Sequence, residues 1–154
     1  MNGVLIVDKP KGWTSHDVVN KARGIFREKR IGHTGTLDPL ATGVLVLCIG
    51  KATKLVRYLE NDDKEYTAEL KLGSTTDTQD ADGRVLDVRE YSPPSIDQIR
   101  GALLSFQGNI QQIPPSFSAL KVSGIPSYRL ARQGTLKVHA GRMVSIDEIR
   151  LHAY

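Results

Sequence analysis

The sequence predicts an α+β domain built on a mixed, largely antiparallel sheet with flanking helices. Runs typical of strands occur at 3–7, 44–49, 64–72 and 85–88, and helical spacing of apolar residues follows Thr14 and Ser95. These segments alternate irregularly, and only a turn-rich stretch separates the runs 64–72 and 85–88. Both features favour antiparallel pairing of neighbouring strands.

The composition is that of an ordinary globular protein. The 154 residues suffice for one domain with a real core, since 40% are hydrophobic and 25% are charged. The net charge of +4 permits a nucleic-acid partner, although many solvated surfaces carry as much. The single cysteine, Cys48, excludes an internal disulfide and is expected to be a buried thiol. With no signal peptide and no apolar run near ~18 residues, a cytoplasmic protein without a membrane span is expected.

The first part of the chain is predicted to form a strand, a turn, a helix and a loop, in that order. The strand at 3–7 is followed by a turn at 8–12, and Thr14 and Ser15 offer an N-cap for a helix. The apolar face of this helix is expected to hold Val18, Ala22, Ile25 and Phe26. The opposite face is basic, which is usual for a solvated helix surface but also permits phosphate contact.

The Gly-rich loop at 32–43 is the centre of the functional interpretation. Its glycines permit tight turns or the close approach of a ligand. Pro39 biases Asp38 toward an extended conformation, so a carboxylate is held on a stiff loop at the start of the apolar strand 44–49. Catalytic groups often occupy such loops. From local chemistry alone, a surface turn in which Asp38 only caps backbone groups is the favoured interpretation.

Later segments are less informative by themselves. A short helix opens at 50–54 and ends in a turn at 61–63. The strict alternation in 64–72 predicts a strand whose apolar face begins with Tyr66, which is either a core residue or a surface for substrate. The acidic segment 77–83 lacks the first and last ligands of a calcium loop. A helix beginning at a Ser95 capping box is expected to stop at Gly108, and strands are expected around 136–138 and 143–151.

Several segments, taken together, resemble one enzyme family. The loop 32–43, G-H-T-G-T-L-D-P-L-A-T-G, and the two residues after it are similar to the signature of the TruB-type tRNA pseudouridine synthases. The family's K-P-x-G-x-T-S, K-x-Y, D-T-x-D-x-x-G and Y-x-x-A-R-x-G patterns are matched at 9–15, 64–66, 77–83 and 128–134. The segment 114–121 resembles its P-P-x-Y-S-A-x-K pattern, with Phe117 where tyrosine is common.

The resemblance implies the roles of the candidate site residues. Asp38 is the expected catalytic carboxylate, Tyr66 is expected against the target base, and His33 is expected to fill the place of a flipped base in the stack. The segment 9–15 is implied to be a structural motif beside the site. Residues expected to bind RNA, through matched motifs or through their position beside the loops, are His33, Lys9, Lys11, Arg30, Lys64, Asp80, Lys121 and Arg132.

The implied reaction isomerises a uridine in the T-loop of tRNA to pseudouridine. It needs no redox or phosphate energy, and we expect no cofactor and no metal. Because the reacting atoms are inaccessible in a stacked loop, the base must be flipped out. The family's proteins are longer, with a later arginine that pairs with the catalytic aspartate and a small RNA-binding (PUA) domain. Residues 1–154 are therefore expected to form part of a catalytic domain, and the full-length protein is expected to be a monomer.

Two other functions compete with this interpretation. The chain could bind or fold RNA on the same scaffold without turnover. A carboxylate glycoside hydrolase would need two catalytic carboxyl groups, and Asp80 is the only plausible second one. Incubation with a T-arm RNA that contains 5-fluorouridine would separate the first alternative from a pseudouridine synthase.

Overall fold

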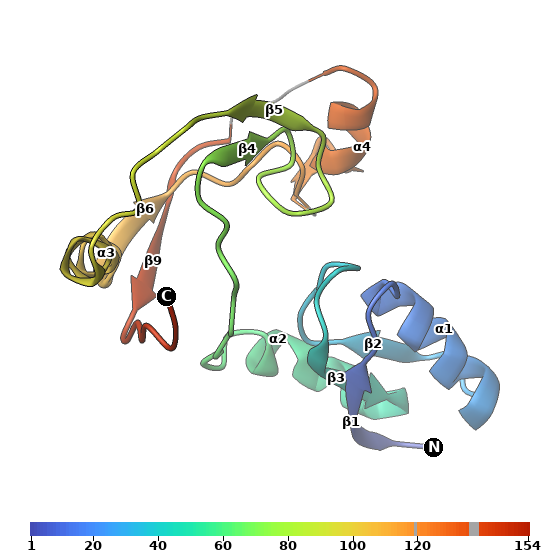
Figure 1. Cartoon of the computed structure of the whole chain (residues 1–154). Helices are drawn as coiled ribbons and strands as arrows, with labels where there is room; N and C mark the ends of the chain where they lie inside the picture. Colours follow the sequence, from blue (N-terminus) through green and yellow to red (C-terminus); the bar gives the residue numbers. More distant parts are fainter. Residues whose placement is uncertain (119, 136–138) are drawn as a thin grey trace. The chain divides into compact units, whose positions relative to one another are not determined.

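The computed structural model describes residues 1–118, 120–135 and 139–154, and of Arg132 it describes the backbone only. The chain forms two compact units, Met1–Glu69 and Leu70–Tyr154. Each unit combines helices with antiparallel strand pairs, so the predicted α+β class is confirmed (Figure 1).

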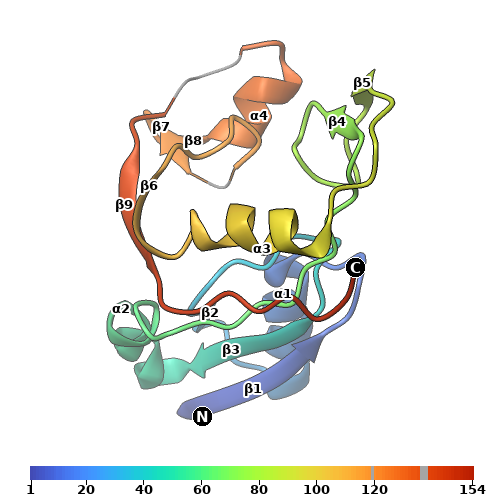
Figure 2. The same ribbon diagram turned by 60° about the vertical axis from the view of Figure 1, so that its left-hand side comes forward.

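The first unit is built on a three-stranded sheet in the order β1-β3-β2. Strand β1 (Gly3–Lys9) pairs antiparallel with β3 (Gly43–Ile49) along its whole length, from Gly3 opposite Ile49 to Lys9 opposite Gly43. The short β2 (Ile31–His33), which the sequence did not predict, pairs with the other edge of β3. Helix α1 (Ser15–Phe26) lies across one face of this sheet (Figure 2).

Helix α1 begins where the sequence predicted. The Thr14 hydroxyl accepts a hydrogen bond from the Asp17 backbone amide at 3.1 Å, and the Asp17 carboxylate accepts one from the Thr14 amide at 2.9 Å. This capping box satisfies donors that the first helical turn leaves unpaired. The helix ends at Phe26 because Arg27 adopts the left-handed conformation, with φ of 49°.

The hydrophobic core of the first unit lies between α1 and the sheet. Its buried members are Val18, Val19 and Ala22 from α1, Ile31 from β2, and Leu45, Leu47 and Ile49 from β3. Partly buried residues that pack against them include Phe26 and Leu37. The prediction that Ile25 lies on the apolar face of α1 was wrong, because Ile25 is 64% exposed. Val19 lies in the core instead, since the buried face of the helix is formed by residues 18, 19 and 22.

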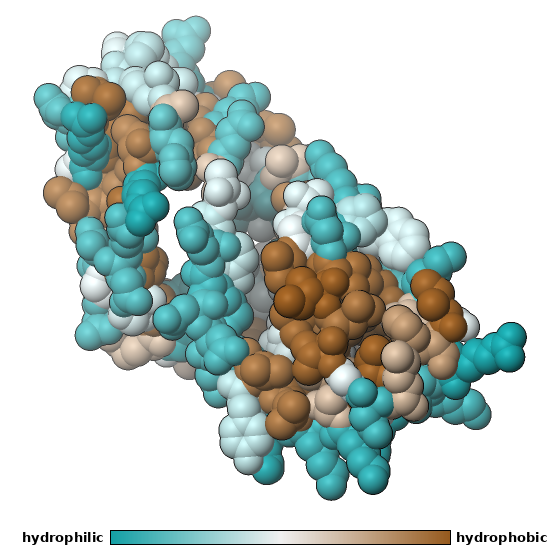
Figure 3. All heavy atoms as spheres, turned by 90° about the horizontal axis from the view of Figure 1, so that it is seen from below, coloured by the Kyte–Doolittle hydropathy of each residue, from teal (hydrophilic) through white to brown (hydrophobic). Residues whose placement is uncertain are grey.

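The strands carry apolar residues on their other face as well. Val4, Ile6 and Val44 are 50%, 69% and 69% exposed. By register, Ile6 lies opposite Val46 and Val4 lies opposite Cys48, so these residues share one side of the sheet. Figure 3 shows hydrophobic residues gathered on a face of the molecule. Cys48 itself is buried, as expected.

A short helical stretch follows β3. The 3₁₀ helix η1 (Gly50–Leu55) continues into α2 (Val56–Leu59), which agrees with the predicted short helix. Gly50 has φ of 61°, and a side chain there would collide with the backbone oxygen of Met1 and the side chain of Asn2. Asn2 in turn accepts a hydrogen bond from the Lys51 amide at 2.6 Å, which fastens the start of β1 to η1.

The predicted strand at 64–72 is absent from the structure. Residues 63–71 have no assigned secondary structure, and residues 61–71 are all exposed. The strand that pairs with β5 (Val85–Val88) is β4 (Ser74–Thr76), which lies just after the predicted segment. The alternation of apolar and polar residues in 64–72 is typical of a strand, but no other segment in the described part of the chain pairs with it.

The second unit consists of small elements. Helix α3 (Ile96–Leu104) begins at the predicted Ser95–Gln98 capping box, and β6 (Gly108–Gln112) pairs with β9 (Arg142–Ile146). Strands β7 (Lys121–Val122) and β8 (Ile125–Pro126) form a hairpin that leads into α4 (Ser127–Arg132). Gly108 opens β6 and does not stop the helix, which already ends at Leu104. The last predicted strand is shorter than 143–151, and the strand predicted at 136–138 lies outside the described residues.

Candidate active site

The loop that carries Asp38 connects β2 to β3. It leaves the sheet after the Thr34 amide donates to the carbonyl of Val46 at 3.1 Å. Within the loop, the Ala41 amide donates to the carbonyl of Asp38 at 3.0 Å, which closes a turn. The two ends of the loop are thus fixed by the sheet, and Asp38 lies at the turn between them.

The residues on both sides of Asp38 are tied to the segment 9–15. The Leu37 amide donates to the Ser15 hydroxyl at 2.9 Å, and the same hydroxyl lies 3.2 Å from the Leu37 carbonyl. On the other side, the carbonyl of Pro39 accepts a hydrogen bond from the Gly12 amide at 2.7 Å. Backbone groups of both neighbours of Asp38 are therefore fixed. This is the kind of preorganisation that a catalytic side chain needs.

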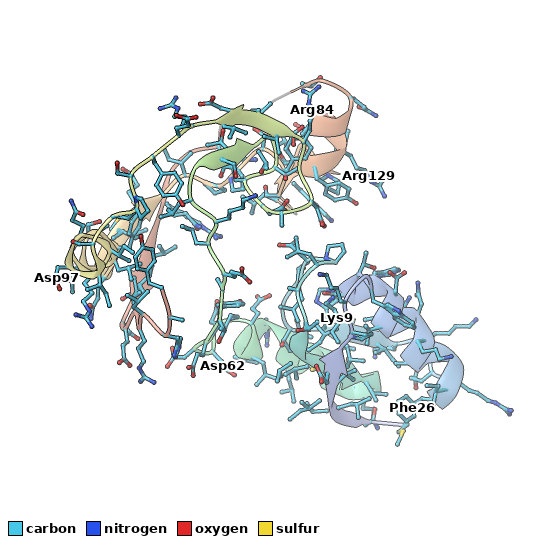
Figure 4. All side chains as sticks on the ribbon, viewed as in Figure 1. Lys9, Phe26, Asp62, Arg84, Asp97 and Arg129 are labelled. Carbon is cyan, nitrogen blue, oxygen red and sulfur yellow. The ribbon has the colours of Figure 1, made fainter. Side chains whose placement is uncertain are left out.

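Lys9 is part of this support. Its side chain is fully buried, and its ammonium group donates to the carbonyls of Trp13 at 2.6 Å, Pro10 at 3.1 Å and Pro39 at 3.5 Å (Figure 4). The ammonium group therefore lies beneath the loop, where no phosphate can reach it. The expectation that Lys9 contacts RNA is corrected on this geometry, and its role is structural.

Asp38 itself is exposed. Within residues 1–118, 120–135 and 139–154, no lysine, arginine or histidine nitrogen lies within 4.0 Å of its carboxylate. The surface-turn alternative predicted that this carboxylate binds backbone groups, but in the described part of the chain its oxygens have no hydrogen-bond donor. The loop thus presents a free, solvated carboxylate.

His33 lies at the end of β2, where the loop begins. Its Nδ1 atom is buried and has no hydrogen-bond partner among the described residues. Burial lowers the pKa of the imidazole below its usual value, the nearby Gly35 backbone opposes this change, and the nearby His16 adds to it. The folded protein therefore favours a neutral imidazole at this position.

The other predicted residues of the first unit are solvent-exposed. Lys11 and Arg30 are exposed, and Arg30 also accepts a backbone hydrogen bond from Gly50 at 2.7 Å. The Lys64 ammonium group donates to the carbonyls of Glu60 and Asp62 at 2.8 and 2.7 Å, which closes the turn after α2. Tyr66 is 69% exposed, so it is not a core tyrosine in this structure.

Three predicted residues belong to the second unit. The Asp80 carboxylate accepts hydrogen bonds from the Thr78 hydroxyl at 2.6 Å and from the Asp82 amide at 3.0 Å, so it stabilises its own turn. Lys121 is exposed on β7, and the side chain of Arg132 lies outside the described residues. Among the described residues, no group of three or more His, Cys, Asp or Glu side chains could hold a metal ion.

Sequence reasoning missed one residue that positions the loop. Leu37 packs against the hydrophobic core of the first unit while its backbone binds Ser15. The signal was the leucine next to Asp38 in a polar, Gly-rich loop, because leucine is among the residue types most often buried.

Comparison with known proteins identifies the class to which this loop belongs. A family model described as "TruB family pseudouridylate synthase (N terminal domain)" matches residues 23–154. The chain therefore belongs to the TruB family of pseudouridylate synthases.

Individual relatives agree with this assignment. A tRNA pseudouridine synthase B from Clostridium acetobutylicum is 50% identical over 151 residues, which are 98% of this chain and 52% of that protein. The protein of the same name from Opitutus terrae is 47% identical over 98% of this chain and 63% of its own length. Among solved structures, the "Crystal Structure of a Cbf5-Nop10-Gar1 Complex" matches with a TM-score of 0.52 and 31% identity over 77% of this chain and 31% of the matched chain. The chain thus spans between half and two thirds of the length of these two curated relatives.

No helix in the described part of the chain is long and apolar enough to cross a lipid bilayer.

Proposed function

We propose that this chain is the N-terminal part of a tRNA pseudouridine synthase that acts on a uridine of the T-loop, with Asp38 as the catalytic carboxylate. The observation that supports the assignment of Asp38 is its placement. The carboxylate is exposed, while hydrogen bonds fix the backbone on both sides, at Leu37 and Pro39. A side chain that only stabilised a turn would instead bind nearby backbone groups.

The isomerisation breaks the bond between N1 of uracil and C1′ of ribose and forms a bond between C5 and C1′. C5 loses its proton and N1 gains one, so the product has the composition of the substrate. Asp38 serves as a nucleophile toward the sugar or the base, or as a base at C2′. Each of these roles requires an ionised carboxylate.

Two further residues are proposed for this site. Tyr66 stacks on the uracil and takes part in removing the C5 proton. His33 occupies the space that the flipped base leaves in the RNA stack, which suits a neutral, half-buried ring at the base of the loop. Lys11 and Arg30 are exposed and are proposed to contact phosphates.

The test uses Asp38→Asn in a chain extended beyond Tyr154 by the remaining part of the Clostridium acetobutylicum relative. The substitution keeps size and removes charge, so turnover of a T-arm stem-loop should be abolished while RNA affinity is retained. Asp8→Asn is the matched control, because Asp8 is also exposed in the first unit but lies on β1. Pseudouridine formation by Asp38→Asn at a rate close to that of the unsubstituted chain would exclude the proposed role, and equal conversion of an anticodon-arm stem-loop would exclude T-loop specificity.

One observation favours RNA binding without turnover for the 154-residue chain by itself. In the described part of the chain, the Asp38 carboxylate lacks the arginine partner that the family resemblance implies. The 154-residue chain should therefore bind the T-arm RNA but convert little or none of it, whereas the extended chain converts it. The two are compared by single-turnover assays on one RNA.

A further inference from the structure

Trp13, the only tryptophan of the chain, lies in the segment that is tied to the Asp38 loop. Two hydrogen bonds join the segment 12–15 to the loop segment 37–39, one of 2.7 Å from the amide of residue 12 to the carbonyl of residue 39 and one of 2.9 Å from the amide of residue 37 to the hydroxyl of residue 15. The two segments therefore run in opposite directions. Trp13 lies between the two bonds on one segment, as Asp38 does on the other, so the two residues lie alongside each other.

The side chain of Trp13 has no partner that explains it. Gly12 has no side chain, the Thr14 hydroxyl caps α1, and the Ser15 hydroxyl binds the loop. Trp13 contributes to this structure through its backbone, since its carbonyl accepts the hydrogen bond from Lys9 at 2.6 Å. Its side chain is 39% exposed, and no acceptor for the indole N–H is found among the described residues. A flat apolar ring with a free donor thus lies beside the carboxylate.

A purely structural role would account for only part of this ring. Trp13 precedes the N-cap of α1, and Val18 is the fourth residue of the helix, which is the spacing of a hydrophobic staple. A staple explains why part of the ring is buried. It would be served equally well by a leucine, and it uses neither the exposed part of the ring nor its N–H group.

We infer that the indole of Trp13 packs against the target nucleotide of the RNA. The inference rests on the proposed function, in which Asp38 approaches C1′, C2′ or C6 of that nucleotide, so that a ring alongside Asp38 reaches the same nucleotide. Aromatic rings bind nucleotides through their flat faces with little dependence on sequence. Trp13 therefore holds the nucleotide at Asp38 and takes no part in proton transfer.

The test compares two T-arm stem-loops that differ at one position. The first has uridine at the target position, and in the second a propyl spacer replaces that nucleotide. Trp13→Leu keeps an apolar side chain for the staple but removes the ring and its N–H group. It should weaken binding of the uridine RNA to the 154-residue chain by roughly tenfold, with no effect on binding of the spacer RNA. Trp13→Phe should recover part of the lost affinity, because it restores a ring.

The fluorescence of Trp13 gives a second readout, because no other tryptophan of the chain contributes to it. The uridine RNA should quench this emission more than the spacer RNA does. Equal quenching by the two RNAs would overturn the inference. The matched control is Tyr58→Leu, which removes a ring that is 62% exposed on α2 and should not change binding of either RNA.

The remaining outcomes separate this inference from the proposed function. Unchanged binding by Trp13→Leu, or an equal loss with Tyr58→Leu, would overturn the inference alone. The same loss for both RNAs, together with a lower melting temperature of Trp13→Leu, would assign Trp13 to the staple and would also overturn it. Failure of the unsubstituted chain to bind the uridine RNA would contradict the proposed function, and the inference with it.

Discussion

The two units of the chain bury their hydrophobic residues very unequally. The first unit packs side chains from α1, β2 and β3 into one cluster, in which Leu47 is fully buried. In the second unit, across 70–118, 120–135 and 139–154, the only buried hydrophobic core residue is Ala131, while Leu86 and Leu104 are 60% and 67% exposed. The comparison teaches that helices and hairpins can form from local signals, whereas a core requires elements that face one another.

The largest expected effect tests this difference in packing. Leu47→Ala should lower the free energy of unfolding of the first unit by about 2–5 kcal/mol, because it removes a fully buried side chain and leaves a cavity. Leu86→Ala on β5 should cost less than about 0.5 kcal/mol, because Leu86 is 60% exposed. Urea unfolding followed by circular dichroism measures both, and similar losses would mean that the second unit has a core of its own.

A smaller effect is expected at the two capping boxes, which have the same chemistry in different surroundings. Thr14→Ala should destabilise the first unit by about 1 kcal/mol, since α1 contributes to the core and loses its cap. Ser95→Ala removes the equivalent cap of α3, in which no residue is buried. Its effect should therefore be confined to fraying of α3, seen as faster amide exchange at 96–100 with little change in melting. An equal shift in melting temperature for both variants would contradict the expected difference between the two caps.

The smallest effect concerns pH and the first unit alone. Because the pKa of His33 is lowered in the folded state, the unfolded chain binds more protons at mildly acidic pH. Stability should therefore be full above the usual histidine pKa and should fall as the pH drops from about 6.5 toward the lower, folded value. Urea titrations at several pH values should show this slope, and His33→Gln should reduce it. An unchanged slope in that variant would assign the pH dependence to other groups.

Features encoded by neighbouring residues could be predicted from the sequence. The start of α1 follows from Thr14 and Asp17, and the loop 32–43 follows from its glycines and the Asp38–Pro39 pair. Features that depend on distant residues could not. The alternation in 64–72 indicates which face of a strand would be buried. Whether the segment forms a strand depends on a second segment that pairs with it.

The candidate site likewise has features that follow from neighbouring residues and features that depend on distant ones. The exposure of Asp38 agrees with the stiff loop that its sequence suggests, whereas the burial of Lys9 contradicts the reading of a lysine in a polar turn as a solvated charge. The reason is that its ammonium group donates to the carbonyl of Pro39, which is 30 residues away in the sequence and is brought close to Lys9 only in the folded structure. Ser15 is similar, because its bonds to Leu37 join residues that are far apart in the sequence.

The buried ammonium group of Lys9 also offers a chemical reporter of folding. Every other lysine in the described part of the chain is exposed, so an amine-reactive reagent should acylate those residues first. Lys9 should react only when the Asp38 loop lifts away from the segment 9–15. Mass spectrometry of a timed acylation would thus measure how often the Asp38 loop opens.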